Sequence, residues 1–228
     1  MTSLRAARPL RRRALGAALA TIATLGVATA AAQPASAAKC TKVSPAAEPS
    51  GTTSLASVLL ADKDEFDKNW KDYDIVTQAV LAVLAAKPSS PVSVLTKGDV
   101  ALTAFIPDDR AFRALVKDLT GKAPNTEKAV FAAVAGLGID TVETVLLYHV
   151  VPGATIDSKT ALGADGAALT TAQGGKITVD VRGNKSKVIV LVDADTDDLD
   201  PRVSVVDINK GNKQIAHGIS RVLRPVNL

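Results

Sequence analysis

The hydrophobic pattern of the chain changes near Pro152, and this change limits the possible folds more than any other feature. Before Pro152, apolar residues recur with the spacing of amphipathic helices; after it, short aliphatic runs are separated by Gly, Asn and Asp turns. Helical segments early and strands late predict an α+β fold of mostly antiparallel strands. No internal repeat is evident, so we expect the helical half and the β-rich half to form a single domain.

The same patterns give approximate boundaries for the elements. We expect helices over residues 73–86, from an Asp108 cap to a stop at Gly121, from 125 or 126 to 135, and from Asp140 into 148–149. In the last of these, Glu143 follows Asp140 by three residues and resembles a capping box. Strands are expected over residues 177–181, 188–192, 203–208 and 214–223.

The N-terminal 37 residues resemble a secretory signal. Five arginines precede an Ala/Leu/Ile-rich run, and Ala35-Ser-Ala37 offers a small-residue cleavage site. An uncleaved membrane anchor is the alternative, which the weakly apolar composition disfavours. We therefore expect a signal peptide over 1–37, a flexible linker over 38–53, a domain over 54–228, and no transmembrane segment after cleavage.

The apparent basicity of the chain belongs to this signal. Removing its five arginines from the 27 basic residues leaves 22 against 23 acidic ones, so the formal charge falls from +4 to −1. All seven aromatic side chains lie before residue 149, so the β-rich half has no stacking platform for bases. Both observations argue against a nucleic-acid partner.

Catalytic and metal-binding signatures are missing from the sequence. We find no nucleophile elbow, phosphate-binding Gly-rich loop or zinc-protease motif, and the chain is expected not to be an enzyme and to need no cofactor. His149 and His217 have no cysteine near them, so we expect two structural histidines and no metal. The acidic run Asp193–Asp200 lacks the Gly and Glu of a calcium loop and is interpreted as a solvated hairpin, with a weak calcium site as the alternative.

Three segments form a recognisable set. The first runs from Thr103 to Leu115, the second is Val145-Leu-Leu-Tyr-His-Val-Val-Pro-Gly153, and the third runs from Asp207 to Pro225. Their positions of interest are Thr103, Phe105, Pro107, Asp109 and Phe112 in the first segment, Tyr148 and His149 in the second, and Asp207 and Ile208 in the third. Adjacent residues point in different directions, so Tyr148 and His149 cannot both face one ligand squarely.

In order and spacing, these segments resemble the fasciclin-like (FAS1) domain family. The resemblance covers most of the chain from about Leu55 onward and implies a β-sandwich or wedge with a layer of helices packed on it. It also implies that Tyr148, His149, Asp207 and Ile208 serve either as partner contacts or as packing residues, since the Tyr-His motif is associated with integrin binding in animal relatives. Ser220 stands where many relatives carry an acidic residue, and Val205-Val206 replace the Glu-Pro of an animal Glu-Pro-Asp-Ile segment.

The resulting hypothesis is a secreted, single-domain binding or adhesion module that contacts a protein or a cell-surface or matrix component. We expect it to be a monomer. Its expected location is extracellular, with association with the cell envelope as an option. The alternative is a carrier of a small molecule or envelope lipid, in which aliphatic residues of the β half line an apolar pocket.

Overall fold

The computed structural model describes residues 49–62 and 66–227. The expected signal peptide (1–37) and residues 38–48 of the expected linker lie outside this range. The linker's remaining residues are attached to the domain: the Gly51 N–H donates to the Gly211 carbonyl at 3.0 Å, and the Thr53 N–H donates to Asn212 Oδ1 at 2.9 Å. Contacts with the domain therefore begin a few residues before residue 54.

The helices and strands follow the expected division of the chain. The helices are α1 (Leu55–Leu59), α2 (Asp74–Ala86), the 3-10 helix η1 (Pro91–Thr96), α3 (Asp109–Thr120), α4 (Glu127–Ala135), α5 (Ile139–Tyr148) and α6 (Ser158–Leu162). The strands are β1 (Leu102–Pro107), β2 (Val150–Pro152), β3 (Ala168–Thr170), β4 (Lys176–Arg182), β5 (Val188–Val192), β6 (Val203–Ile208) and β7 (Gln214–Ile219).

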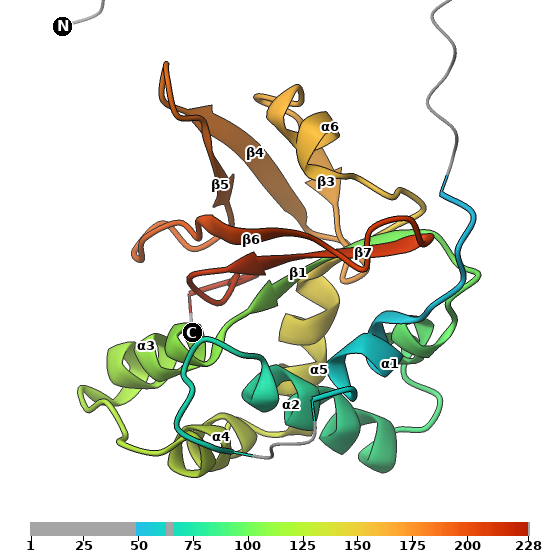
Figure 1. Ribbon diagram of the computed structural model, residues 1–228. Helices are drawn as coiled ribbons and strands as arrows, with labels where there is room; N and C mark the ends of the chain where they lie inside the picture. Colours follow the sequence, from blue (N-terminus) through green and yellow to red (C-terminus); the bar gives the residue numbers. More distant parts are fainter. Residues whose placement is uncertain (1–48, 63–65, 228) are drawn as a thin grey trace, which may run out of the picture. The chain divides into compact units, whose positions relative to one another are not determined.

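The strands form two sheets, and the fold is α+β. One sheet has the order β2-β1-β7-β6, and the other has the order β3-β4-β5. Strands β1 and β7 pair in parallel from Leu102 opposite Gln214 to Pro107 opposite Ile219, and the remaining strand pairs are antiparallel. Figure 1 shows the four-stranded sheet between two layers, with α2 to α5 on one side and the three-stranded sheet with α6 on the other.

Strand β1 is buried on both of its faces and separates two hydrophobic cores. Leu102, Ala104 and Ile106 point to the core shared with the helices, whereas Phe105 belongs to the core between the sheets. Strand β7 divides in the same way, since Ala216 belongs to the helical core and Ile219 to the core between the sheets. The short run from Leu102 to Pro107 therefore holds the two halves together.

Helix ends agree with the expected caps in two cases and differ in a third. Asp108 caps α3 by accepting from the Ala111 N–H at 2.9 Å, and Gly121 ends that helix with φ of 74°. The expected capping box in α5 is wrong, because α5 begins at Ile139 after Gly138, and Glu143 pairs with Lys87 of the α2 end instead. The last strand is also shorter than expected, ending at Ile219.

Within residues 49–62 and 66–227, no single helix has both the length and the hydropathy of a membrane span. Helices α4 and α5 meet those criteria only when taken as a pair, and the pair is bent by 105°.

The packing of Tyr148 against Gly175 gives a direct test of the core between the sheets. A Cβ at residue 175 would lie 2.8 Å from the Tyr148 ring, closer than carbon atoms pack. We expect Gly175→Ala to lower the free energy of unfolding by about 1–3 kcal/mol, measured by urea denaturation.

Gly163→Ala is the matched control for that substitution. A Cβ at residue 163 would meet its nearest atom at 3.5 Å, an ordinary contact, and Gly163 has φ of −92°. We expect a change within about 0.5 kcal/mol. Equal effects of the two substitutions would contradict the tight packing of Tyr148.

Candidate functional site

The Tyr-His pair ends helix α5 and is buried. Tyr148 is 0% exposed, its ring packs in the core between the sheets, and its hydroxyl donates to the Lys176 carbonyl at 2.7 Å. Burial is the largest cause that raises the pKa of Tyr148. The ring is therefore a packing element with its polar tip satisfied.

His149 connects the end of α5 to the C-terminal segment. Its Nδ1 lies 2.7 Å from the Val145 carbonyl, and its Nε2 lies 2.9 Å from the Leu223 N–H. These partners require a neutral ring that donates from Nδ1 and accepts at Nε2. Burial lowers the pKa of His149 to about 4, which agrees with that neutral state.

Asp207 lies at the other end of the predicted site and fixes helix α6. Its backbone has φ of 61°, and its two carboxylate oxygens accept from the Ser158 N–H and hydroxyl, each at 2.7 Å. Lys210 donates to the same carboxylate at 2.7 Å. Burial favours the neutral form, but the bonds from Lys210 and Ser158 outweigh it, so the pKa of Asp207 is lowered.

Phe105 of β1 links the two predicted pairs. Its N–H donates to the His149 carbonyl at 2.9 Å, and its ring stacks on His217 with centroids 6.0 Å apart. His217 Nδ1 in turn accepts from the Asp207 N–H at 3.3 Å. The structure therefore brings Tyr148-His149 and Asp207-Ile208 together through the core, with Ile208 packed against the helical core.

The other predicted motif residues also have structural contacts. Thr103 Oγ1 donates to the Ala154 carbonyl and accepts from the Ile156 N–H, each at 2.8 Å. Asp109 Oδ1 accepts from the Ile75 N–H at 3.0 Å, and Phe112 is buried in the helical core. Pro107 ends strand β1. These residues of the first segment therefore hold backbone groups in place or fill the helical core.

Both histidine rings are fully engaged by backbone groups. His149 is bonded to Val145 and Leu223, and His217 Nε2 lies 2.8 Å from the Ile156 carbonyl while its Nδ1 accepts from Asp207. A general base or a metal ligand needs a ring nitrogen with a free lone pair. In this conformation neither ring offers one.

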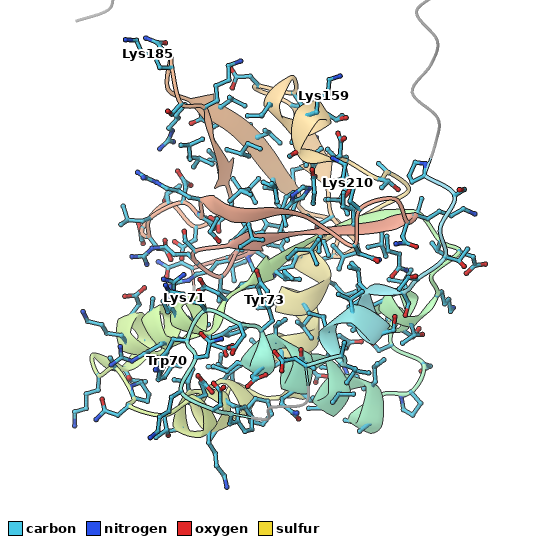
Figure 2. All side chains as sticks on the ribbon, in the orientation of Figure 1. Trp70, Lys71, Tyr73, Lys159, Lys185 and Lys210 are labelled. Carbon is cyan, nitrogen blue, oxygen red and sulfur yellow. The ribbon has the colours of Figure 1, made fainter. Side chains whose placement is uncertain are left out.

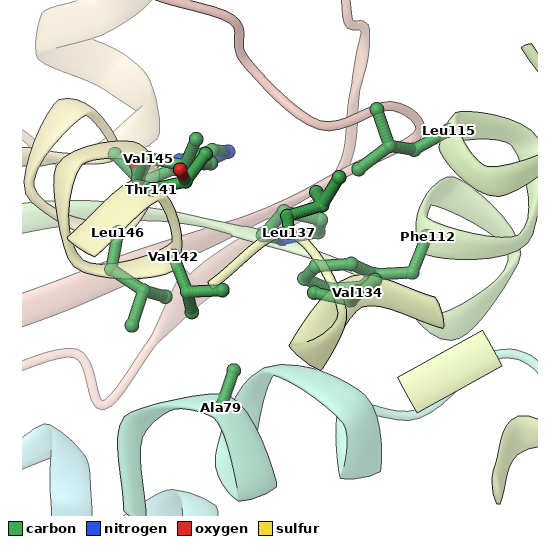
Figure 3. A pocket seen from close by; sticks show the side chains of 11 residues that line it. Ala79, Phe112, Leu115, Val134, Leu137, Thr141, Val142, Val145 and Leu146 are labelled. Carbon is green, nitrogen blue, oxygen red and sulfur yellow. The ribbon is translucent and has the colours of Figure 1, made fainter. Parts of the chain in front are cut away.

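Two apolar cavities lie beside these histidines. One, of about 20 Å³, is lined by residues of α3, α4 and α5 together with His149, and Figure 3 shows Phe112, Val134, Val142 and Leu146 around it. The other, of about 80 Å³, lies between the sheets beside His217 and Phe105. Both volumes are far below the roughly 300–1,000 Å³ of ligand pockets.

The acidic run Asp193–Asp200 corrects one expectation. It is not a solvated hairpin, because Asp195 is 4% exposed and pairs with the buried Arg224 at 3.3 Å. Asp198 pairs with the same guanidinium at 2.9 Å, and Asp193 accepts from the Arg224 N–H at 2.8 Å. The run therefore holds the C-terminal segment at Arg224 through three of its carboxylates.

The neutral His149 makes a testable contribution to the pH dependence of stability. Its pKa is about 4 when folded and about 6.5 when unfolded, so the unfolded chain takes up the proton first as the pH falls. The contribution is complete above pH 6.5 and is lost toward pH 4, amounting to roughly 3 kcal/mol. Between pH 7.5 and pH 4, the unfolding free energy of the wild type should fall by roughly 3 kcal/mol more than that of His149→Gln.

Urea denaturation of both proteins across this range measures the difference. Both proteins contain the buried or half-buried carboxyl groups whose pKa values are raised, so their titration cancels in the comparison. These groups include Asp109, Glu127 and Asp193. A stability difference between the two proteins that is independent of pH would contradict a buried, neutral His149.

Comparisons with known proteins gave matches to solved structures and to one family model. Seventeen chains of solved structures match, among them a FAS1 domain pair from the insect cell adhesion molecule fasciclin I, at 15% identity and a TM-score of 0.42. That match covers 66% of this chain and 43% of the other, and no curated protein matches. The fasciclin domain family model matches residues 77–225. Because this match spans more than half of the sequence, the chain belongs to the fasciclin (FAS1) domain family.

Proposed function

We propose that this protein is a secreted, non-enzymatic binding module that acts in adhesion to a protein or to a cell-surface or matrix component. FAS1 domains are commonly extracellular adhesion modules, which supports the general class. The signal-like N-terminus supports export. The engagement of both histidine rings by backbone groups argues against turnover.

The observation that carries this proposal is an exposed apolar pair on edge strand β6. Val205 is 45% exposed and Val206 is 49% exposed, although aliphatic side chains on a strand usually face a core. They directly precede Asp207-Ile208, the positions that the family resemblance associates with partner contact. A partner that covers these two valines would remove exposed apolar surface from water.

The geometry of β6 suits a docking edge. The strand is last in the order β2-β1-β7-β6, and its pairing with β7 shifts register between Val203 and Val205 and again before Ile208. An irregular edge of this kind resists pairing with the same edge of a second copy, which agrees with a monomer. Asp207 and Lys210 fix its end to α6, as the position of Lys210 in Figure 2 illustrates.

In this proposal the four predicted contact residues divide into two roles. Asp207 and Ile208 position the exposed strand and lie next to the partner. Tyr148 and His149 support it from the core, since their side chains are buried. Replacing either of the last two would weaken binding by disturbing the fold.

The carrier alternative receives no support from the two apolar cavities beside the histidines. The cavity between the sheets is lined by aliphatic residues, as a carrier would need, but its volume of about 80 Å³ has room for a few waters only. A nucleic-acid partner is also disfavoured, because the formal charge without the five N-terminal arginines is −1.

Attachment assays on a double variant test the proposal. We expect Val205→Thr with Val206→Thr to keep the strand, because threonine is also β-branched, while weakening attachment to cells of the source organism or to their matrix by about tenfold or more. Half-saturating protein concentration on immobilised cells is the measurement, and circular dichroism verifies folding.

Leu60→Thr is the matched control, since Leu60 is 50% exposed and follows α1 in the helical half. It should attach as the wild type does. If the wild type attaches and the double variant attaches equally well, β6 is not the contact. If the wild type does not attach at all, the adhesion role itself is contradicted.

A further inference from the structure

Three helices of the domain begin at one place, and each begins with an acidic residue. Asp74, Asp109 and Glu127 are the first residues of α2, α3 and α4. The positive ends of three helix dipoles meet there, and each stabilises a nearby anion by about 0.3–1 kcal/mol. All three side chains are buried, with Asp109 and Glu127 at 0% exposure.

The segment that precedes α2 brings two more carboxylates to these helix ends. The Asp109 N–H donates to the Asp72 carbonyl and the Arg110 N–H donates to the Trp70 carbonyl, each at 3.2 Å. Figure 2 shows Trp70 and Tyr73 of this segment in the helical half of the domain. Asp72 is thereby fixed at the start of α3, and Asp67 lies five residues before it in the same segment.

The carboxylates fall into two overlapping groups that share Asp72. Ligand oxygens of Asp67, Asp72 and Glu127 all lie within 4.8 Å of one another, as do those of Asp72, Asp74 and Asp109. Across the part of the chain that the structure describes, no ion pair joins any of these five carboxylates to a lysine or arginine. Two oxygens on opposite sides of a calcium ion lie about 4.8 Å apart, so the oxygens of either group are close enough together to share one cation.

A shared proton can relieve the charge repulsion in the group that contains Asp109, but not in the group that contains Glu127. Burial, followed by the hydrogen bond with Asp72, raises the pKa of Asp109 to about 9, so a proton can bridge these two side chains. Glu127 differs, because both of its oxygens are buried and neither has a hydrogen-bond partner. Its pKa is raised to about 7, first by burial and then by Asp72, Asp67 and Asp74, and a proton there would also lack an acceptor.

We propose that Asp67, Asp72 and Glu127 bind a calcium ion that joins the segment before α2 to the start of α4. The ion supplies the partner that both Glu127 oxygens lack and neutralises a group of like charges. Asp67 is exposed, so it gives solvent access and leaves room for water ligands. Asp74 and Asp109, each already accepting a backbone N–H, form the outer supports of the site.

The ligand chemistry selects calcium among common cations. All the donors are carboxylate oxygens, the type preferred by hard cations, and zinc would favour nitrogen or sulfur. Magnesium demands octahedral ligands at about 2.0–2.1 Å, whereas calcium accepts irregular sets at about 2.3–2.6 Å. An irregular set of carboxylates from a loop and a helix end therefore suits calcium better than magnesium.

Thermal unfolding of the whole chain at pH 7.5 tests the site. After treatment with a chelator, addition of 10 mM CaCl₂ should raise the Tm by about 4 °C or more, as expected for an affinity in the 10⁻⁴–10⁻³ M range of extracellular calcium modules. NaCl at matched ionic strength should not reproduce the shift, and MgCl₂ should produce less of it. Calorimetric titration should give one calcium per chain.

Two variants make the test specific to these residues. Glu127→Gln should abolish the calcium shift, and in chelator it should be at least as stable as the wild type because it removes a repelled charge. Asp67→Asn, at an exposed position, should weaken calcium affinity about tenfold without affecting folding. Glu143→Gln, the same substitution at a glutamate that binds Lys87, should keep the full calcium shift.

Other results would overturn the site. The proposal is wrong if calcium raises the wild-type Tm no more than NaCl does. It is also wrong if Glu127→Gln and Asp67→Asn both show the full calcium shift. Stabilisation on lowering the pH from 7.5 to 5.5, with no response to calcium, would assign the cluster to protons alone.

Discussion

The burial of strand β1 on both faces is the constraint on which the rest of this domain depends. Its alternating side chains enter two different cores, and its backbone pairs with β2 on one edge and with β7 on the other. A parallel pair needs a long connection, and here α3, α4, α5 and the whole three-stranded sheet lie between β1 and β7 along the chain. Because β1 and β7 are paired, the end of α5, with Tyr148 and His149, lies beside the C-terminal segment that follows β7.

This arrangement explains how the residues of the family signature stabilise the fold. Thr103, Phe105 and Asp109 satisfy backbone groups or fill the core, and His149 carries the connection from α5 to Leu223. Buried polar groups that are fully hydrogen-bonded specify one packing, and any replacement leaves a partner unsatisfied. The proposed contacts use side chains that these hydrogen bonds do not involve, namely the exposed valines of β6 and the buried, unpaired carboxylate of Glu127 at the start of α4.

Local patterns predicted much of the fold. The apolar spacing of α2 and α3, the Asp108 cap and the aliphatic runs of β4, β5 and β6 are visible in the sequence, because helix and strand periods are local properties. The pairing of β1 with β7 is not visible in local patterns, because these strands are more than 100 residues apart in the sequence. Burial of Asp195 was missed for the same reason: its partner, Arg224, is distant in sequence. The state of Glu127 cannot be predicted from local sequence, because it depends on three helices beginning at one place; both of its carboxylate oxygens are buried without a hydrogen-bond partner.

Native-state hydrogen exchange, followed residue by residue, tests the central role of β1 most directly. The amides of Phe105 and Ile106 and of their neighbours in β7 should exchange most slowly, with a free energy of opening equal to that of global unfolding, because they open only when both cores separate. Amides at the β3 edge and in α6 should exchange through smaller openings. Faster exchange in β1 than in the three-stranded sheet would show that the two cores are held together by something else.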